Sequence, residues 1–401
     1  MNADRPWMTA ADAARALRVS RATLYAYVSR GFVRSESVPG SSRERRYARD
    51  DVERLQRRSE ERRDPDKAAA RALHWGLPIL ESSIALIDDH HLYYRGHDAV
   101  TLARSRSVAD VASLIWTGRF ETALAAAQHQ TPAAGLTDDD LPFVARAQSV
   151  LAAASVHDLL ASDLRAANAA LCGWRILHLM TAAAAPTTAA TSTIDRTLAR
   201  AWRASDRGGD LLRAALILCA DHELNVSAFA ARCVASAGSN PYAVVIAGLA
   251  ALEGVRHGGI SARVEAMLES LRGSGRLRRA VGERLRRGER LEGFGHPLYR
   301  DGDPRAVALI ALLEERYAKS AELAFVLDVA AAAADATGEK PTIDFALAAL
   351  ARVLRLPSGS PLTLFAIGRT IGWIGHAIEQ YATGQLIRPR AKYVGVMPVG
   401  Q

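Results

Sequence analysis

Three segments in the second half of the chain place a histidine beside glycines or beside residues that end helices. They are residues 221–225 (DHELN), 254–259 (GVRHGG) and 293–297 (GFGHP). An imidazole or amide released from a helix into a turn can donate a hydrogen bond to a bound carboxylate or carbonyl. Glycines let the backbone approach a ligand closely. His222, Asn225, His257 and His296 are therefore candidate site residues, although a helix-end cap is the simpler interpretation of His222 alone.

A carboxylate within an apolar stretch provides a candidate base. Asp344 lies between Ile343 and Phe345. Loss of solvation raises the proton affinity of a carboxylate, which suits a general base. The competing interpretation makes Asp344 the N-cap of a helix over residues 345–354.

Several arginines could bind anions. Arg305 follows the third histidine segment, and Arg369 lies among apolar residues, where a buried guanidinium needs an anionic partner. Arg388, near the C-terminus, would alone pass for an ordinary surface charge. A basic run precedes the third segment and could meet the phosphates of a nucleotide-like cofactor, while a solvated helix face explains it equally well. This run comprises Arg284, Arg286, Arg287 and Arg290.

Helices are expected to position these residues. Of the 401 residues, 49% are hydrophobic but only 6% are aromatic, and the abundant Ala and Leu are among the best helix formers. Helical periodicity is strong from Leu211 to about Thr383. The Ala-rich stretch 119–205 is expected to hold three or four helices. The length suggests two or three domains, and the composition predicts an all-α fold.

The N-terminus predicts a separate basic unit. The chain has a formal net charge of +8, and residues 1–63 hold fifteen Arg against nine Asp and Glu. Thr9 and Ser20 are placed to cap two successive helices, and residues 32–47 resemble a short hairpin wing. This order is similar to the winged helix-turn-helix of MerR-type and excisionase-like domains, whose second helix enters the major groove of DNA. A helical oligomerisation arm with a solvated basic face is the alternative.

From about residue 76 to 395 the chain resembles citrate synthases and 2-methylcitrate synthases. The histidine segments, the Asp344 segment and the Tyr-Arg-Gly turn at 94–96 carry this resemblance. It implies large and small helical subdomains, at about 76–240 with 350–401 and at about 241–349. A winged helix-turn-helix domain at 1–60 and a linker at 61–75 would precede them.

The resemblance also implies roles in a condensation of the tricarboxylic acid cycle. Asp344 would remove a methyl proton from acetyl-CoA while His257 hydrogen-bonds the thioester carbonyl, and His296 would polarise the ketone of oxaloacetate. Water would then cleave the thioester. The implied ligands of the substrate carboxylates are His222, Asn225, Arg305, Arg369 and Arg388. The implied ligands of CoA are Arg287, Arg290 and Arg300.

Arg388 would reach the site of a neighbouring subunit, which implies a homodimer with shared active sites. No tightly bound cofactor is expected, because the acyl-CoA is a co-substrate. Propionyl-CoA is an alternative to acetyl-CoA, since one methylene changes discrimination by only ~1–3 kcal/mol. A second alternative is a DNA-binding regulator that senses citrate, oxaloacetate or an acyl-CoA through an inactive domain. The complete acid/base set favours the enzyme, because a sensor has no need of a base.

The chain departs from the family pattern after the second histidine segment. Ile260 and Ser261 replace the usual small residue and Asn, and Val255 replaces a common Pro. We expect these changes to affect packing beside the CoA and not a catalytic group.

Other features of the sequence suggest a cytoplasmic protein without a metal site. No apolar stretch approaches the ~20 residues that cross a bilayer, and the N-terminus lacks the apolar core of a signal peptide. Its cysteines show no paired metal spacing, which favours buried thiols in a reduced compartment. They are Cys172, Cys219 and Cys233.

Overall fold

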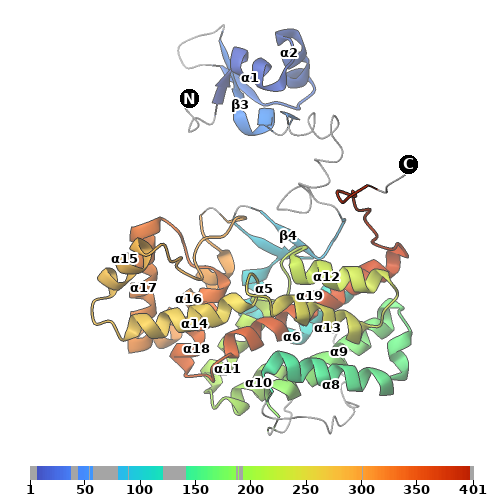
Figure 1. Cartoon of the computed structure of the whole chain (residues 1–401), viewed down its shortest axis with the longest axis vertical. Coiled ribbons are helices and arrows are strands. Elements are labelled where there is room, and N and C mark those ends of the chain that lie inside the picture. The colour runs from blue at the N-terminus through green and yellow to red at the C-terminus, as the bar shows by residue number, and fades with distance from the viewer. Residues whose placement is uncertain are drawn as a thin grey trace. The chain divides into compact units, whose positions relative to one another are not determined.

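The computed structural model describes most of the chain, and the chain forms two compact units, Met1–Glu81 and Ser82–Gln401 (Figure 1). The described residues are 7–37, 44–53, 55–56, 80–88, 90–120, 141–186, 188, 193–299 and 301–397. The predicted linker at 61–75 lies outside them, so the predicted domain limits remain predictions. No helix in the described part is long and apolar enough to cross a membrane.

The first unit combines two capped helices with a three-stranded antiparallel sheet. Both predicted caps are present: Thr9 accepts a hydrogen bond from Asp12 N at 3.2 Å, and Ser20 accepts one from Thr23 N at 3.1 Å. The predicted wing is present as the pair β2–β3, although its tip at 38–43 lies outside the described residues. The sheet order is β1-β3-β2. The elements are β1 (Trp7–Thr9), α1 (Ala10–Leu17), α2 (Arg21–Ser29), β2 (Ser35–Ser37) and β3 (Arg45–Ala48).

The second unit begins with a small antiparallel sheet and two short helices. Strands β4 (Ala85–Ile87), β5 (Leu92–Tyr94) and β6 (His97–Asp98) pair in sequence order. The tight turn between β5 and β6 has positive φ at both Arg95 and Gly96. Helices α5 (Ala99–Ser105) and α6 (Val108–Thr117) follow. A capping box of Ser107 and Asp110 begins α6, as the sequence predicts for a helix at 108–117.

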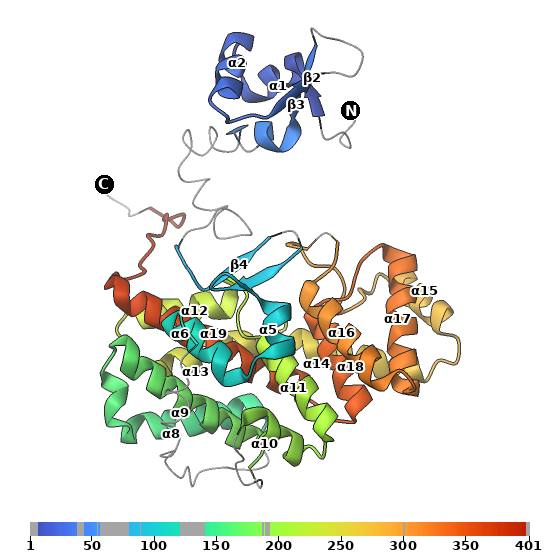
Figure 2. The same cartoon turned by 180° about the vertical axis from the view of Figure 1, so that it is seen from behind.

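The remaining helices form two groups, which Figures 1 and 2 show at opposite ends of the unit. The helices from 141 to 252 form one group: α8 (Phe143–His157), α9 (Ala166–Ala184), α10 (Ile194–Ala201), α11 (Asp206–Leu218), α12 (Val226–Ser236) and α13 (Pro241–Leu252). Those from 259 to 354 form the other: α14 (Gly259–Arg272), α15 (Leu277–Arg286), α16 (Pro304–Tyr317), α17 (Ala321–Thr337) and α18 (Ile343–Leu354). The predicted small subdomain begins at about residue 241 and so includes α13, which packs against α8, α9 and α12. The subdomain limits remain a prediction.

Helix α19 (Ser360–Thr383) is buried along most of its length and packs against helices of both groups. Two of its glycines allow the backbone at the end of α11 to approach closely. A Cβ at Gly368 would lie 2.5 Å from Leu216 O, and one at Gly372 would lie 2.4 Å from Ala220 O. Since such distances are too short for real Cβ atoms, glycine is required at both positions. This approach places the turn at 219–225 directly against α19.

Candidate active site

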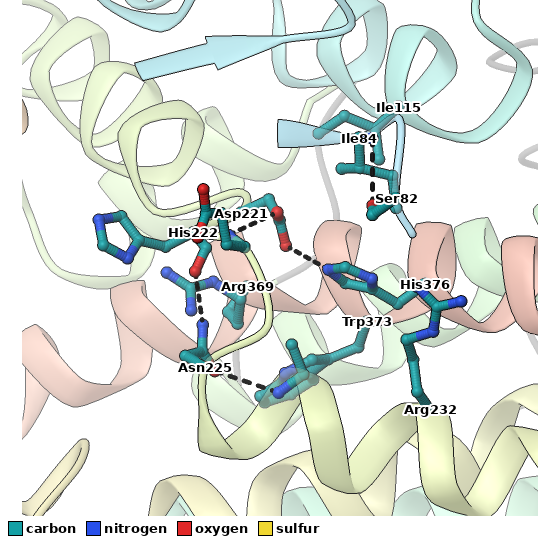
Figure 3. A network of polar contacts seen from close by, with 12 residues as sticks. Ser82, Ile84, Ile115, Asp221, His222, Asn225, Arg232, Arg369, Trp373 and His376 are labelled. Atoms are coloured by element: carbon teal, nitrogen blue, oxygen red, sulfur yellow. Dashed lines mark hydrogen bonds and ion pairs between the residues drawn. The ribbon is translucent and has the colours of Figure 1, made fainter. Parts of the chain in front are cut away.

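The turn after α11 presents His222 and is held by a buried contact between Asp221 and His376. Asp221 Oδ1 lies 3.1 Å from His376 Nε2 on α19, and both side chains are fully buried. The other carboxylate oxygen of Asp221 accepts a hydrogen bond from Glu223 N at 3.1 Å, and Glu223 has a positive φ of 51°. Figure 3 shows the His222 ring pointing away from His376. Asp221 therefore fixes the backbone that orients His222.

His222 joins two other aromatic side chains from the loop before α16. Its Nε2 lies 3.0 Å from the hydroxyl of Tyr299, and its ring centroid lies 5.2 Å from that of His296. Nδ1 of His296 accepts a hydrogen bond from Leu298 N at 3.2 Å. Burial, aided by the charge of Arg305, lowers the pKa of His296 to about 4 and that of His222 well below its usual value. Both rings are neutral at pH 7, and a neutral His296 carries its proton on Nε2.

Arg305 is buried and paired with a neighbouring carboxylate. Asp303 accepts hydrogen bonds from Arg305 Nε at 2.9 Å and Nη2 at 2.8 Å. Burial opposes the ionisation of Asp303, but the charge and hydrogen bonds of Arg305 lower its pKa overall. The same carboxylate accepts a hydrogen bond from Ile343 N at 2.9 Å. Asp303 thus ties Arg305 to the first turn of the helix that carries Asp344.

Arg369 lies under the turn after α11 with spare hydrogen-bonding capacity. Its Nε donates to Cys219 O at 2.8 Å, and its guanidinium carbon lies 4.7 Å from the centre of the Phe365 ring. Within the described part of the chain, its buried Nη2 has no hydrogen-bond partner. Burial lowers the pKa of Arg369, and the charge of Asp221 opposes this effect. A buried donor without a partner is costly, so this group is well suited to an anionic ligand.

His257 also contacts the Phe365 ring, edge-on, with 5.9 Å between ring centroids. Its Nε2 lies 2.8 Å from Ser227 Oγ. That hydroxyl accepts a hydrogen bond from Trp373 Nε1 at 3.2 Å and donates one to Asn225 Oδ1 at 2.8 Å. The contact of His257 with Ser227 uses Nε2, so Nδ1 is the ring nitrogen left for a ligand. Burial, and then the charge of Arg369, lower the pKa of His257 to about 4. This imidazole is also neutral at pH 7.

Asp344 is held in the first turn of α18 and is not its cap. The N-cap is Thr342, so the capping interpretation of Asp344 is wrong. Ser261 Oγ donates to Asp344 Oδ1 at 2.7 Å, and burial raises the pKa of Asp344. The loop that carries His296 is tied to the residues just before Asp344, because Gly295 N donates to Lys340 O at 2.9 Å and Thr342 N donates to Gly293 O at 2.8 Å.

Of the other predicted substrate ligands, Asn225 borders this cluster, because its Nδ2 donates to His222 O at 3.4 Å and its Oδ1 accepts from Ser227 Oγ at 2.8 Å. Asn225 caps α12, accepting hydrogen bonds from Ser227 N and Ala228 N, both at 3.1 Å. Arg388 is exposed in the segment after α19. Their predicted contacts with substrate remain predictions.

The predicted CoA ligands also remain untested. Arg287 Nε lies 2.6 Å from Glu289 Oε1, and Arg284 Nη1 lies 3.0 Å from Glu289 Oε2, which is what a solvated helix face would show. Arg290 lines a shallow cavity of about 280 Å³. Arg300 lies outside the described residues.

Sequence reasoning missed the residues that support the site. Tyr299 and Asp303 lie close to His296 in sequence, so their polar side chains were a visible signal. Ser227 and His376 gave no such signal, because their partners are distant along the chain. Ser261 was marked only as a departure from the family pattern, and its contact with the distant Asp344 was not foreseen.

The cluster thus combines three neutral imidazoles, a carboxyl of raised pKa and two buried guanidinium groups in a mostly helical unit, as in an acid/base enzyme for anionic substrates. A sequence model described as "Citrate synthase, C-terminal domain" matches residues 72–390, and one described as "Helix-turn-helix domain" matches residues 7–59. The chain therefore belongs to the citrate synthase family and carries an N-terminal helix-turn-helix domain. Both resemblances are confirmed, as is the predicted all-α fold.

Individual relatives agree with this assignment. Citrate synthase of Haloferax volcanii is 37% identical over 45% of this chain and 49% of its own length. The 2-methylcitrate synthase of Shewanella oneidensis is 33% identical over 46% of this chain and 50% of its own. The chain thus aligns with about half the length of these curated relatives. The crystal structure of citrate synthase from Thermotoga maritima matches with a TM-score of 0.70 and 27% identity, covering 81% of this chain and 96% of that one.

Proposed function

We propose that the second unit condenses an acyl-CoA, acetyl-CoA in the first instance, with oxaloacetate and then hydrolyses the thioester. The observation that supports this proposal is a set of buried groups that shares two arginines: the charge of Arg305 acts on Asp344 and His296, and that of Arg369 acts on His257. A binding protein would need the arginines, but it would not need a carboxyl of raised proton affinity held near neutral imidazoles.

Oxaloacetate would be bound first by the cationic and imidazole groups. The unpartnered Nη2 of Arg369 supports a role in holding a carboxylate, and Arg305 and His222 lie in the same buried cluster. Guanidinium groups select planar carboxylates through paired hydrogen bonds, which lysines cannot do. Arg388 of a second copy would complete the site, so the functional unit would be a homodimer. Asn225 would contribute through the turn that it stabilises.

Enolisation of the acyl group would follow. Asp344 would take a proton from the methyl carbon, while Nδ1 of His257 donates a hydrogen bond to the thioester oxygen. This needs the tautomer in which Ser227 turns its one hydroxyl proton from Asn225 Oδ1, 2.8 Å away, to His257 Nε2 and leaves the ring proton on Nδ1. Each preorganised donor at a developing oxyanion contributes about 2.7–4 kcal/mol, and holding both substrates together contributes at most about 7–11 kcal/mol.

Carbon–carbon bond formation would use His296. Its Nε2–H would polarise the keto oxygen and transfer its proton as the enolate carbon attacks, while Asp344 holds the proton taken from the methyl group. Water would then attack the thioester carbonyl and give a proton back to Nε2 of His296, while Asp344 returns its proton to the leaving CoA thiolate. The products are a carboxylate, the free CoA thiol and one released proton. The phosphates of CoA would be held by Arg287, Arg290 and Arg300, and no cofactor beyond this co-substrate is required.

A thiol-release assay with acetyl-CoA and oxaloacetate tests this function. We expect turnover by the full chain and none above background for Asp344→Ala. Equal thiol release by both proteins would overturn the proposal and favour a sensing domain. Propionyl-CoA should be run beside acetyl-CoA, because one relative is a 2-methylcitrate synthase; a higher kcat/KM with propionyl-CoA would change the acyl substrate and leave the mechanism intact.

We further propose that the first unit binds duplex DNA through α2 and the wing. Arg21 and Tyr25 lie four residues apart on one face of α2, and Tyr25 is 52% exposed. Arg45 on β3 is also exposed. We expect salt-sensitive binding to duplex DNA that is lost when residues 1–60 are deleted. Equal affinity with and without that segment would contradict this proposal.

A further inference from the structure

Ser261 contacts the carboxyl group that the proposed reaction uses as its base. It lies in the first turn of α14, it is fully buried, and its Oγ donates to Asp344 Oδ1 at 2.7 Å. Among the described residues, it is the one whose side chain hydrogen-bonds Asp344. The sequence comparison with the family suggested only a packing difference at this position, so the contact corrects that expectation.

We propose that Ser261 is a positioning residue that fixes the orientation of the Asp344 carboxylate and favours its ionised form. The inference rests on the proposed function of the second unit. A hydroxyl has one proton to donate, and an ionised carboxylate only accepts hydrogen bonds. Donation to Oδ1 leaves Oδ2 as the oxygen that can take a proton from the substrate. The hydroxyl also offsets part of the cost of burying the charge, because hydrogen bonds to ionised groups are the stronger ones.

Other charged groups act on Asp344 from neighbouring elements. Arg305 on α16 favours the ionised form, and Asp303 beside it disfavours that form. The thiol of Cys219, the residue that follows α11, is also buried near these groups. The charges of Arg305 and Asp303 act on its pKa, as does the charge of Arg369 on α19. Asp303 and Arg305 pair with each other, so their opposing effects on Asp344 partly cancel. The direct hydrogen bond from Ser261 therefore has a large share in setting the proton affinity of Asp344.

Three substitutions at Ser261 separate its hydrogen bond from its volume. Ser261→Ala removes the donor, Ser261→Cys keeps nearly the same volume with a weak donor, and Ser261→Thr keeps the hydroxyl. Ser274→Ala is the matched control, because Ser274 lies beyond the other end of α14 and its hydroxyl donates to Leu271 O. Tm measurements on all variants check that the fold is retained.

The pH profile of kcat/KM is the first readout. Its acid limb reports the essential base of the free enzyme. We expect this limb to move up by about one pH unit in Ser261→Ala and Ser261→Cys, the size expected for one hydrogen bond to a charged group. It should stay in place in Ser261→Thr and Ser274→Ala. A purely structural role would lower the plateau in the Ser261 variants without moving the limb, and that result would overturn the inference.

The second readout does not depend on turnover. In protein labelled with ¹³C at the aspartate carboxyl groups, the Asp344 resonance is the one absent from Asp344→Asn. Its titration midpoint should rise in Ser261→Ala, and an unchanged midpoint would overturn the inference whether or not the protein is active. Absence of thiol release by the unsubstituted chain would instead refute the proposed function, so the two failures are distinguishable.

Discussion

Replacing His376 with leucine is expected to weaken the binding of oxaloacetate selectively. His376 touches no predicted substrate group, but its Nε2 lies 3.1 Å from Asp221, whose carboxylate holds the turn that carries His222 (Figure 3). Leucine would leave the buried Asp221 with one donor, Glu223 N. Leaving a buried polar group without a partner costs about 1–3 kcal/mol.

The turn can relieve that cost by moving Asp221 towards solvent, which would displace His222 from the cluster. If the whole cost falls on ligand binding, the KM for oxaloacetate rises by about 5- to 150-fold, since 1.4 kcal/mol corresponds to a factor of ten. The KM for acetyl-CoA should change much less, because His257 and Asp344 are held by Ser227 and Ser261.

Steady-state kinetics with each substrate varied in turn measures this difference. His376→Gln should restore most of the affinity, because its amide can donate to Asp221. His178→Leu is the matched control: His178 is on α9, and its buried Nε2 has no partner among the described residues, so its loss should leave both KM values unchanged. Equal increases in the two KM values for His376→Leu, or no change in either, would refute the reasoning.

Three further results are expected. Asp303→Asn removes the charge paired with the buried Arg305 and should lower the Tm, since breaking such a pair costs about 3–5 kcal/mol; an unchanged Tm in calorimetry would contradict this. Gly372→Ala places a Cβ 2.4 Å from Ala220 O, so chemical denaturation should show a loss of about 1–3 kcal/mol, and wild-type stability would count against the close approach. Finally, burial lowers the pKa values of His257 and His296 from 6.5 to about 4. Between pH 4 and pH 6.5 the unfolded chain therefore binds more protons than the folded chain. The Tm should fall as the pH drops from 6.5 to 4. That slope should be shallower in His257→Gln, and an equal slope in both proteins would argue against a neutral buried imidazole.

Local features of the structure follow from local features of the sequence. Thr9, Ser20 and Ser107 cap helices that begin at the next residue, because a cap needs only a short side chain three residues before its partner. Helix α11 was expected from Leu211 but begins at Asp206, after Ser205. Its first turn is polar and holds two glycines, so hydrophobic periodicity does not detect it.

The candidate site was predictable where its residues are unusual and unpredictable where they depend on distant partners. His257 and His296 are flanked by glycines, which marks them in the sequence. The pair Asp221 and His376 spans 155 positions and the pair Ser261 and Asp344 spans 83, so no local pattern connects them. The structure also shows ion pairs of Glu289 with Arg284 and Arg287, and these pairs were predictable, because Glu289 lies in the same short stretch of sequence.

The glycines of α19 have a consequence for how this protein can diversify. At Gly368 and Gly372 the backbone of α19 lies against main-chain oxygens at the end of α11, and these atoms set the distance between the two helices. The volumes of side chains contribute little to that distance. Mutations that repack the Ala- and Leu-rich interior elsewhere should therefore leave the distance between Arg369 and His222 nearly constant. A lineage could alter the rest of the second unit or its N-terminal unit extensively while this main-chain junction kept the proposed oxaloacetate site at its original width.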